Sequence, residues 1–290
     1  MIDLIKNKFN NSPFIGFVSF LIVLLVMPLG HTLMILIETF FPNNLLFPFL
    51  VGLIGAILIF VGGNKNSNLT ATWLGFFGAI LIWTGWIEFA FLFWAKKINL
   101  NPLIIDSEVY TKPEYLILPS SIGILFATLI YFLLNPNTRC NFFVWLQKIF
   151  RIKFKNGISQ SKKNYSTITF IETIYALWFF YVLLLILFDK NIVKQNEFIT
   201  LIYLFLNLIW TIFLLFKLSK IKIIDLAFRY SIPTAIIFWN NIEILGKMNY
   251  LTEFWILPKI YGIELIILFL FFVSIASFTF IFNLKDNETK

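Results

Sequence analysis

The stretch PEYLILPSSIGI at residues 113–124 recurs as TEFWILPKIYGI at residues 252–263. In both copies a Glu, the triplet Ile-Leu-Pro, a Gly and an Ile keep the same spacing. Pro is tolerated in the first turns of a helix because its missing N–H has no partner there, and Gly lets a neighbouring backbone approach. The stretch therefore predicts the start of an apolar helix, and its recurrence predicts an internal duplication.

The similarity extends upstream of both copies. ILIWTGWIEF at residues 80–89 and AIIFWNNIEI at residues 235–244 each carry an Ile-Glu pair near the end, with the acids at Glu88 and Glu243. The third and fourth apolar segments thus correspond to the seventh and eighth. Units of four spans run in the same direction, so we expect a parallel 4+4 repeat about an axis along the membrane normal.

The composition places these helices in lipid. The chain has 290 residues, of which 59% are hydrophobic and only 13% charged, about half the charged share of a soluble domain. Crossing a bilayer takes about 20 apolar residues. The sequence therefore predicts an all-α polytopic membrane protein with about eight transmembrane helices. We place them near 14–37, 45–62, 71–95, 115–135, 169–188, 197–217, 228–246 and 255–283.

The distribution of Lys and Arg predicts the orientation. With the N-terminus inside, most of the 23 basic residues fall on the cytoplasmic side, so both termini are expected to be cytoplasmic. The expected organisation is a first four-helix unit at 1–135, a basic linker at 136–168 and a second four-helix unit at 169–290. We expect a bacterial plasma membrane or a thylakoid-like internal membrane. A basic inner face beside anionic lipid accounts for the net charge of +8, so no nucleic acid partner is expected.

The linker contains the segment NFFVWLQKIFRIKF at residues 141–154. Phe142, Trp145 and Ile149 recur at helical spacing, and Lys148 and Arg151 lie between and beyond them. This pattern predicts an amphipathic helix on the inner leaflet. The alternative is an ordinary linker with lysines close to the membrane.

Ionisable residues inside spans are functional candidates, because they are costly in hydrocarbon. At about 1.5 Å of rise per residue, four such residues fall in the outer half of the bilayer at similar depths: His31, Glu88, Glu243 and Glu264. Two further polar residues share helix faces with the glutamates, one turn earlier. We predict a substrate-binding or ion-binding cluster formed by His31, Thr84, Glu88, Asn240, Glu243 and Glu264. Snorkelling of Glu88 and Glu243 to the outer interface, beside a belt of tryptophans, is the alternative.

The rest of the sequence limits the chemistry. His31 and Cys140 are the only histidine and cysteine, which excludes His-cluster and CxxC metal sites. The sequence has no Gly-rich phosphate loop and no nucleophile elbow. We therefore expect no metal and no nucleotide cofactor. The expected partners are membrane lipids and a hydrophobic or cationic small-molecule substrate.

Three functions follow from this pattern. The first is transport of a proton, a small cation or a small solute by the outer-half carboxylates, and parallel repeats suit rocking of one half against the other. Glu172 and Asn207 are the candidates for a path through the inner half. Another is a non-catalytic subunit or assembly factor of a membrane complex, since Phe- and Trp-rich faces suit lateral contacts.

The third is a membrane-embedded enzyme, and it depends on a resemblance. Residues 238–272 resemble one unit of the small membrane-embedded lycopene cyclases. Trp239-Asn240 stands where that family carries Trp-Asp, and residues 260–264 stand where it carries Pro-x-Glu-Glu, followed by a Phe-rich run. The resemblance implies a cofactor-free modification of an isoprenoid lipid. Glu264 or Glu243 would then be the catalytic acid that protonates a polyene double bond.

Overall fold

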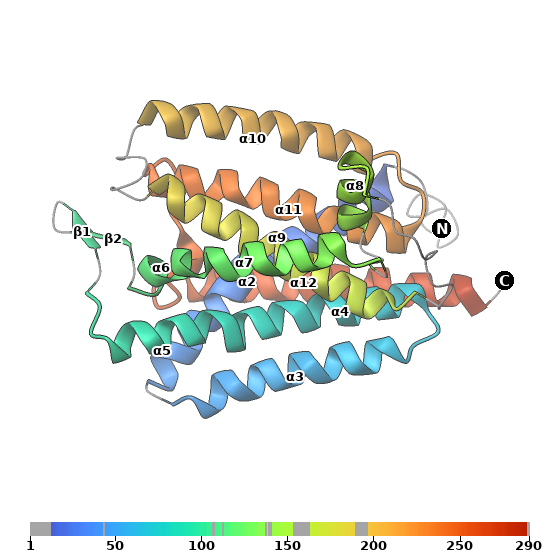
Figure 1. Ribbon diagram of the computed structural model, residues 1–290. Helices are drawn as coiled ribbons and strands as arrows, with labels where there is room; N and C mark the ends of the chain where they lie inside the picture. The colour runs from blue at the N-terminus through green and yellow to red at the C-terminus, as the bar shows by residue number, and fades with distance from the viewer. Residues whose placement is uncertain are drawn as a thin grey trace. The chain divides into compact units, whose positions relative to one another are not determined.

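The computed structural model describes residues 13–42, 44–101, 103–105, 108–111, 113–136, 138, 141–152, 163–188 and 197–288. Helices dominate these residues, and one antiparallel hairpin is present (Figure 1). The elements in chain order are α2 (Phe14–Phe40), α3 (Leu46–Gly63), α4 (Asn68–Ile82), the π-helical η1 (Trp83–Glu88), α5 (Phe89–Lys97), β1 (Leu103–Ile105), β2 (Glu108–Thr111), α6 (Pro113–Ile117), the 3₁₀-helical η2 (Leu118–Ser121), α7 (Ile122–Leu134), α8 (Asn141–Ile149), α9 (Tyr165–Phe188), α10 (Glu197–Leu218), α11 (Ile224–Lys247), the 3₁₀-helical η3 (Phe254–Ile256) and α12 (Gly262–Glu288).

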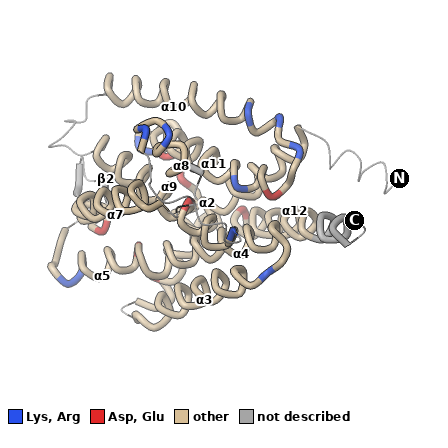
Figure 2. The backbone as a smooth tube through the Cα atoms, turned by 45° about the vertical axis from the view of Figure 1, so that its right-hand side comes forward, with Lys and Arg blue, Asp and Glu red and all other residues tan. Residues whose placement is uncertain are grey.

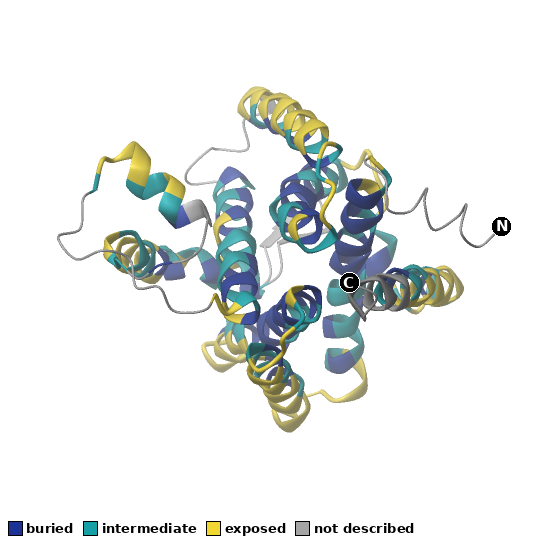
Figure 3. Ribbon diagram, turned by 90° about the vertical axis from the view of Figure 1, so that its right-hand side faces the viewer, coloured by how far each residue is buried: buried dark blue, intermediate teal, exposed yellow. Residues whose placement is uncertain are grey.

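Within the described residues, seven helices are long and apolar enough to cross a membrane. The segments α4–η1–α5 and α6–η2–α7 each count as one of them. Large apolar side chains cover their outer faces, and buried residues lie on the opposite sides (Figure 3). Lys and Arg lie mainly near helix ends and turns (Figure 2). These features confirm the prediction of a polytopic integral membrane protein.

The seventh expected span, 228–246, is a helix but is not one of the seven apolar ones. It corresponds to α11, which carries Asp225, Arg229 and three buried polar residues near its C-terminal end. Because α11 packs against α2 on one side and α10 on another, its polar side chains face protein. An enclosed helix of this kind does not need the apolar surface of a lipid-facing one.

The helices form two compact units. Unit 1 consists of α2, α10, α11, η3 and α12, and unit 2 consists of the elements from α3 to α9. This grouping differs from the expected boundaries, because the first long helix joins the C-terminal helices and α9 joins the earlier ones. Residues 1–12 and 153–162, which include the N-terminus and most of the polar part of the linker, lie outside the described residues.

In unit 2, close backbone contacts pack α3 against α4 and η1. A Cβ added to Gly55 would lie 2.6 Å from the carbonyl oxygen of Gly78. One added to Gly85 would lie 2.5 Å from both the Gly52 nitrogen and the Pro48 oxygen. Small residues at such positions allow the close helix approach on which packing in lipid depends.

The other side of α4 packs on α9. Ala79, Ile82, Trp83 and Ile174 form a buried apolar cluster there. Beyond α5, the chain forms the β1–β2 hairpin, which pairs Ile105 with Glu108 and has an irregular register between Leu103 and Ile104.

In unit 1, α11 packs between α2 and α10. The helix α2 also contacts α12 and η3. Ser231 on α11 places its hydroxyl 3.2 Å from the carbonyl oxygen of Ser19 on α2. This contact joins α11 to α2 about three turns before the polar residues Asn240, Asn241 and Glu243.

Candidate functional site

Glu243 on α11 lies at the centre of the polar cluster in unit 1. Its side chain is buried, and its Oε1 accepts a hydrogen bond of 2.8 Å from the indole Nε1 of Trp239, one turn earlier on the same helix. The same oxygen lies 3.5 Å from Nε2 of His31 on α2. Two residues 212 positions apart in the chain thus meet because α2 packs on α11. The structure thus places the predicted residues His31 and Glu243 next to each other.

Aromatic rings enclose this pair. The His31 imidazole stacks on Trp239 with ring centroids 6.1 Å apart, and Trp239 in turn lies 4.7 Å from Trp255 of η3. The hydroxyl of Thr32, next to His31, lies 3.1 Å from the carbonyl oxygen of Trp255. Because these contacts join α2, α11 and η3, they fix the imidazole and the carboxyl in one geometry.

A second polar layer joins α11 to α10. Nδ2 of Asn207 donates to the carbonyl oxygen of Ile237 at 2.9 Å and to Oδ1 of Asn241 at 3.2 Å. The Asn241 amide lies 3.3 Å from the hydroxyl of Thr211, and all three polar side chains are buried. Polar side chains that hydrogen-bond across helices stabilise packing in lipid, and they also mark polar pathways.

Asn240 was predicted as a site residue, and it belongs to the same region. Its side-chain amide nitrogen lies 3.3 Å from the hydroxyl of Tyr203 on α10. Asn240 therefore faces α10, whereas Glu243 faces α2. The predicted site residues of α11 are thus buried on two sides of one helix, three residues apart.

Glu264 does not join this cluster. It lies in the first turn of α12 with an exposed side chain, while the next residue, Leu265, is buried. Glu264 lines a groove with a volume of about 570 Å³. The other residues that line the groove are Thr252, Phe254, Tyr261, Ile267, Leu268 and Phe271. The groove is thus mostly apolar, with one carboxyl group.

Glu88 and Thr84 belong to unit 2, whereas the cluster described above belongs to unit 1. Both are buried in η1, and Glu88 is its last residue. A π-helical turn inside a longer helix is uncommon and often occurs at functional sites. Their predicted association with Glu243 and Glu264 stays a prediction.

Sequence reasoning missed several residues of the site. Trp239 was considered only in an interfacial belt and in the lycopene cyclase resemblance, and Trp255, Thr32, Asn241 and Tyr203 were not considered as site residues. The available signal was the excess of polar residues in α11, a helix flanked by apolar ones. Because the Glu243 side chain is buried and hydrogen-bonded, it does not snorkel to an interface as the alternative proposed.

The described residues contain no group of three His, Cys, Asp or Glu side chains that would hold a metal ion. The chemistry of the site is therefore that of one carboxyl and one imidazole, both of which exchange protons readily. The resemblance of residues 238–272 to the lycopene cyclases stays a prediction. No known protein family, curated protein or solved structure matches this chain.

Proposed function

We propose that this chain is a membrane transporter that moves a proton, a small cation or a small solute, with His31 and Glu243 as its exchange site. One observation carries the proposal: the 3.5 Å contact between the only histidine and a buried glutamate, inside a group of apolar helices. Ionisable residues within membrane helices commonly form ion sites or proton relays. Further polar groups lie between α10 and α11, on Asn207, Thr211 and Asn241.

The proposal includes a parallel 4+4 repeat with both termini in the cytoplasm. Equivalent helices pack in equivalent ways inside the two units, which supports the repeat. In unit 2, α4 packs between α3 and α9, and in unit 1, α11 packs between α10 and α2. Each unit would then contain the last three helices of one repeat and the first helix of the other.

The helix ends add independent support for this repeat. The third span ends with Asn99 and the seventh with Asn249, both in the left-handed backbone region. In each case the next amide nitrogen bonds the carbonyl oxygen five residues earlier, Leu100 to Ala95 and Tyr250 to Leu245. The same helix-ending motif thus closes both predicted counterparts.

Proton flux into vesicles tests the transport proposal. The purified full-length chain is reconstituted with a trapped pH-sensitive dye, and a potassium diffusion potential drives proton entry. We expect flux well above that of protein-free vesicles, and its loss in Glu243→Gln. This substitution keeps an oxygen that can accept from Trp239, so the local fold should be retained. The same vesicle assay with a sodium-sensitive dye tests whether the chain moves a small cation.

Glu264→Gln is the matched control, because it changes an exposed carboxyl on α12 to the same amide. Its flux should equal that of the unchanged protein. The exchange role of Glu243 is wrong if Glu243→Gln keeps full flux, and proton or sodium transport is wrong if the unchanged protein moves neither ion.

The groove at Glu264 favours a second candidate, a lipid-modifying enzyme that acts on an isoprenoid. An apolar groove with a single acid suits a long hydrocarbon and a proton donor. Lipid and pigment profiles of cells with and without the gene test it directly. If the chain is such an enzyme, Glu264→Gln should abolish a lipid or pigment product and Glu243→Gln should leave it in place. The transport proposal expects the reverse, with flux lost in Glu243→Gln and kept in Glu264→Gln.

A further inference from the structure

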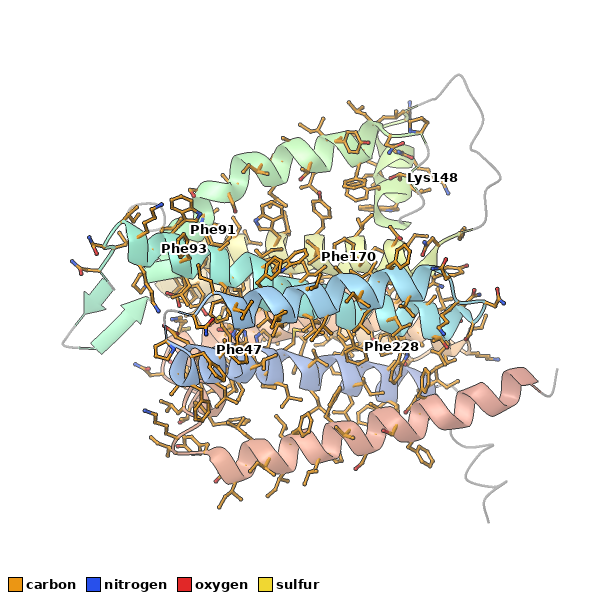
Figure 4. All side chains as sticks on the ribbon, turned by 90° about the horizontal axis from the view of Figure 1, so that it is seen from below. Phe47, Phe91, Phe93, Lys148, Phe170 and Phe228 are labelled. Atoms are coloured by element: carbon orange, nitrogen blue, oxygen red, sulfur yellow. The ribbon has the colours of Figure 1, made fainter. Side chains whose placement is uncertain are left out.

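We propose that α8 is a membrane-surface anchor that binds the anionic head groups of the leaflet facing the inner ends of α7 and α9. The axis of α8 runs across that of α7 rather than along it (Figures 1 and 4). A short helix in this orientation lies in the plane of a membrane that α7 crosses. The proposal extends the predicted amphipathic linker by assigning its docking face, its lipid face and its lipid class.

One face of α8 is fixed to the protein. Phe143 is buried, stacking on Phe132 of α7 at 5.4 Å and meeting Tyr175 of α9 edge-on at 6.0 Å. The Gln147 amide donates to the carbonyl oxygens of Leu133 and Asn135, at 2.9 and 3.1 Å. The last carbonyls of a helix have no partner within it, so Gln147 satisfies groups at the end of α7 that would otherwise need water. The position of α8 is thus set by the fold.

The opposite face is apolar and exposed. Trp145 and Ile149 are 55% and 52% exposed, although each is a large apolar side chain, and Phe150, just after the helix, is 62% exposed. Trp145 and Ile149 are four residues apart, so they form one ridge along the helix. In a protein that crosses a membrane, such a ridge at a helix end fits the head-group region, where Trp is favoured.

Basic residues accompany this ridge and select the lipid. Lys148 is exposed on α8, and Arg151 follows just after the helix ends (Figure 4). Arg151 adopts a left-handed conformation, and the Ile152 nitrogen bonds the Gln147 oxygen at 2.9 Å, which closes the helix. The backbone of Arg151 therefore has a defined conformation, and its guanidinium extends from a position next to the ridge. Apolar side chains with flanking cations are the pattern of helices that bind anionic membrane surfaces.

Collision accessibility of a nitroxide label tests the proposal. Cys140, the only cysteine, is replaced by Ser, and a label is attached at Ile149→Cys in the full-length chain reconstituted into vesicles. The vesicles contain phosphatidylcholine alone or with phosphatidylglycerol. We expect the ratio of oxygen to nickel-chelate collisions at position 149 to rise severalfold when phosphatidylglycerol is added. A label at Gly123→Cys, on an open face of α7, should not respond to lipid charge.

Charge removal separates the contributions of the ridge and the cations. Each basic residue near an anionic surface changes binding roughly fivefold, so Lys148→Gln with Arg151→Gln should largely remove the response to phosphatidylglycerol. Both substitutions leave Phe143 and Gln147 in place. Nickel access that is equally high in both lipids overturns the proposal. If oxygen reaches the label but the ratio of oxygen to nickel-chelate collisions is the same in both lipids, the choice of anionic lipid is overturned. If neither reagent reaches the label, a protein covers this face instead of lipid.

Discussion

The two units pack their helices with different chemistry. In unit 2, α3 approaches α4 and η1 through glycines, so that backbone lies against backbone. In unit 1, α10 instead contacts α11 through the buried side chains of Asn207, Thr211 and Asn241. The comparison teaches that one arrangement of helices can be held either by close approach or by buried hydrogen bonds. In unit 1 these hydrogen bonds lie on one side of α11, and the His31–Glu243 pair lies on the other side of the same helix.

The largest expected effect comes from breaking the glycine contact in unit 2. Gly85→Val places a side chain against the backbone of α3, where no flexible group can move aside. We expect a loss of about 3 kcal/mol in the free energy of unfolding, measured by denaturant titration in mixed micelles. Gly123→Val is the control, because a Cβ there meets nothing within 4 Å. Equal stability of the two variants would remove the packing role assigned to Gly85.

A smaller effect is expected from the polar contact in unit 1. Asn241→Leu and Asn207→Leu each remove one side of a 3.2 Å hydrogen bond, and the double variant should cost less than the sum. We expect a coupling free energy of about 1 kcal/mol from the cycle of four proteins, measured in the same micelles. Thr128→Val combined with Asn241→Leu should be additive, because Thr128 bonds within its own helix. Strict additivity of the two asparagine changes would contradict a direct interaction.

The smallest effects test whether the two units are equivalent. In unit 1 the Thr32 hydroxyl reaches the η3 carbonyl of Trp255, and in unit 2 the Trp178 indole donates to the η2 hydroxyl of Ser121 at 2.8 Å. Thr32→Val and Ser121→Ala should each cost about 0.6 kcal/mol, because each removes one bond between a long helix and a 3₁₀ segment. Thermal unfolding of the two variants in one detergent compares them. A several-fold difference between their costs would argue against equivalent roles.

Much of the fold could be predicted because length and apolar content determine where a helix crosses lipid. The position of α11 between α2 and α10 could not, since its composition shows only that it is more polar than its neighbours. The depth of a residue follows from its position along a helix, but the direction of its side chain does not. Glu264 illustrates this limit: one residue corresponds to a rotation of about 100°, and Leu265 is buried where Glu264 is exposed.

From the sequence, His31 and Glu243 could be predicted only to lie at similar depths in the bilayer, not to be in contact. Nothing in the hydropathy of α2 specifies that it packs on α11, near the other end of the chain. The hydrogen-bond donor to Glu243 was easier to predict, because Trp239 precedes it by one turn on the same helix. Such a spacing places two side chains on one face and is a usable signal when the helix is known to be enclosed.

The most direct test of the central claim is infrared difference spectroscopy of the reconstituted protein between two pH values. If Glu243 exchanges a proton beside His31, the spectrum contains a reversible carboxyl C=O band. The band should shift in His31→Gln, disappear in Glu243→Gln and persist in Glu264→Gln. A spectrum that is the same in Glu243→Gln as in the unchanged protein would contradict the account, because the carboxyl at the centre of the site would then take no part in proton exchange.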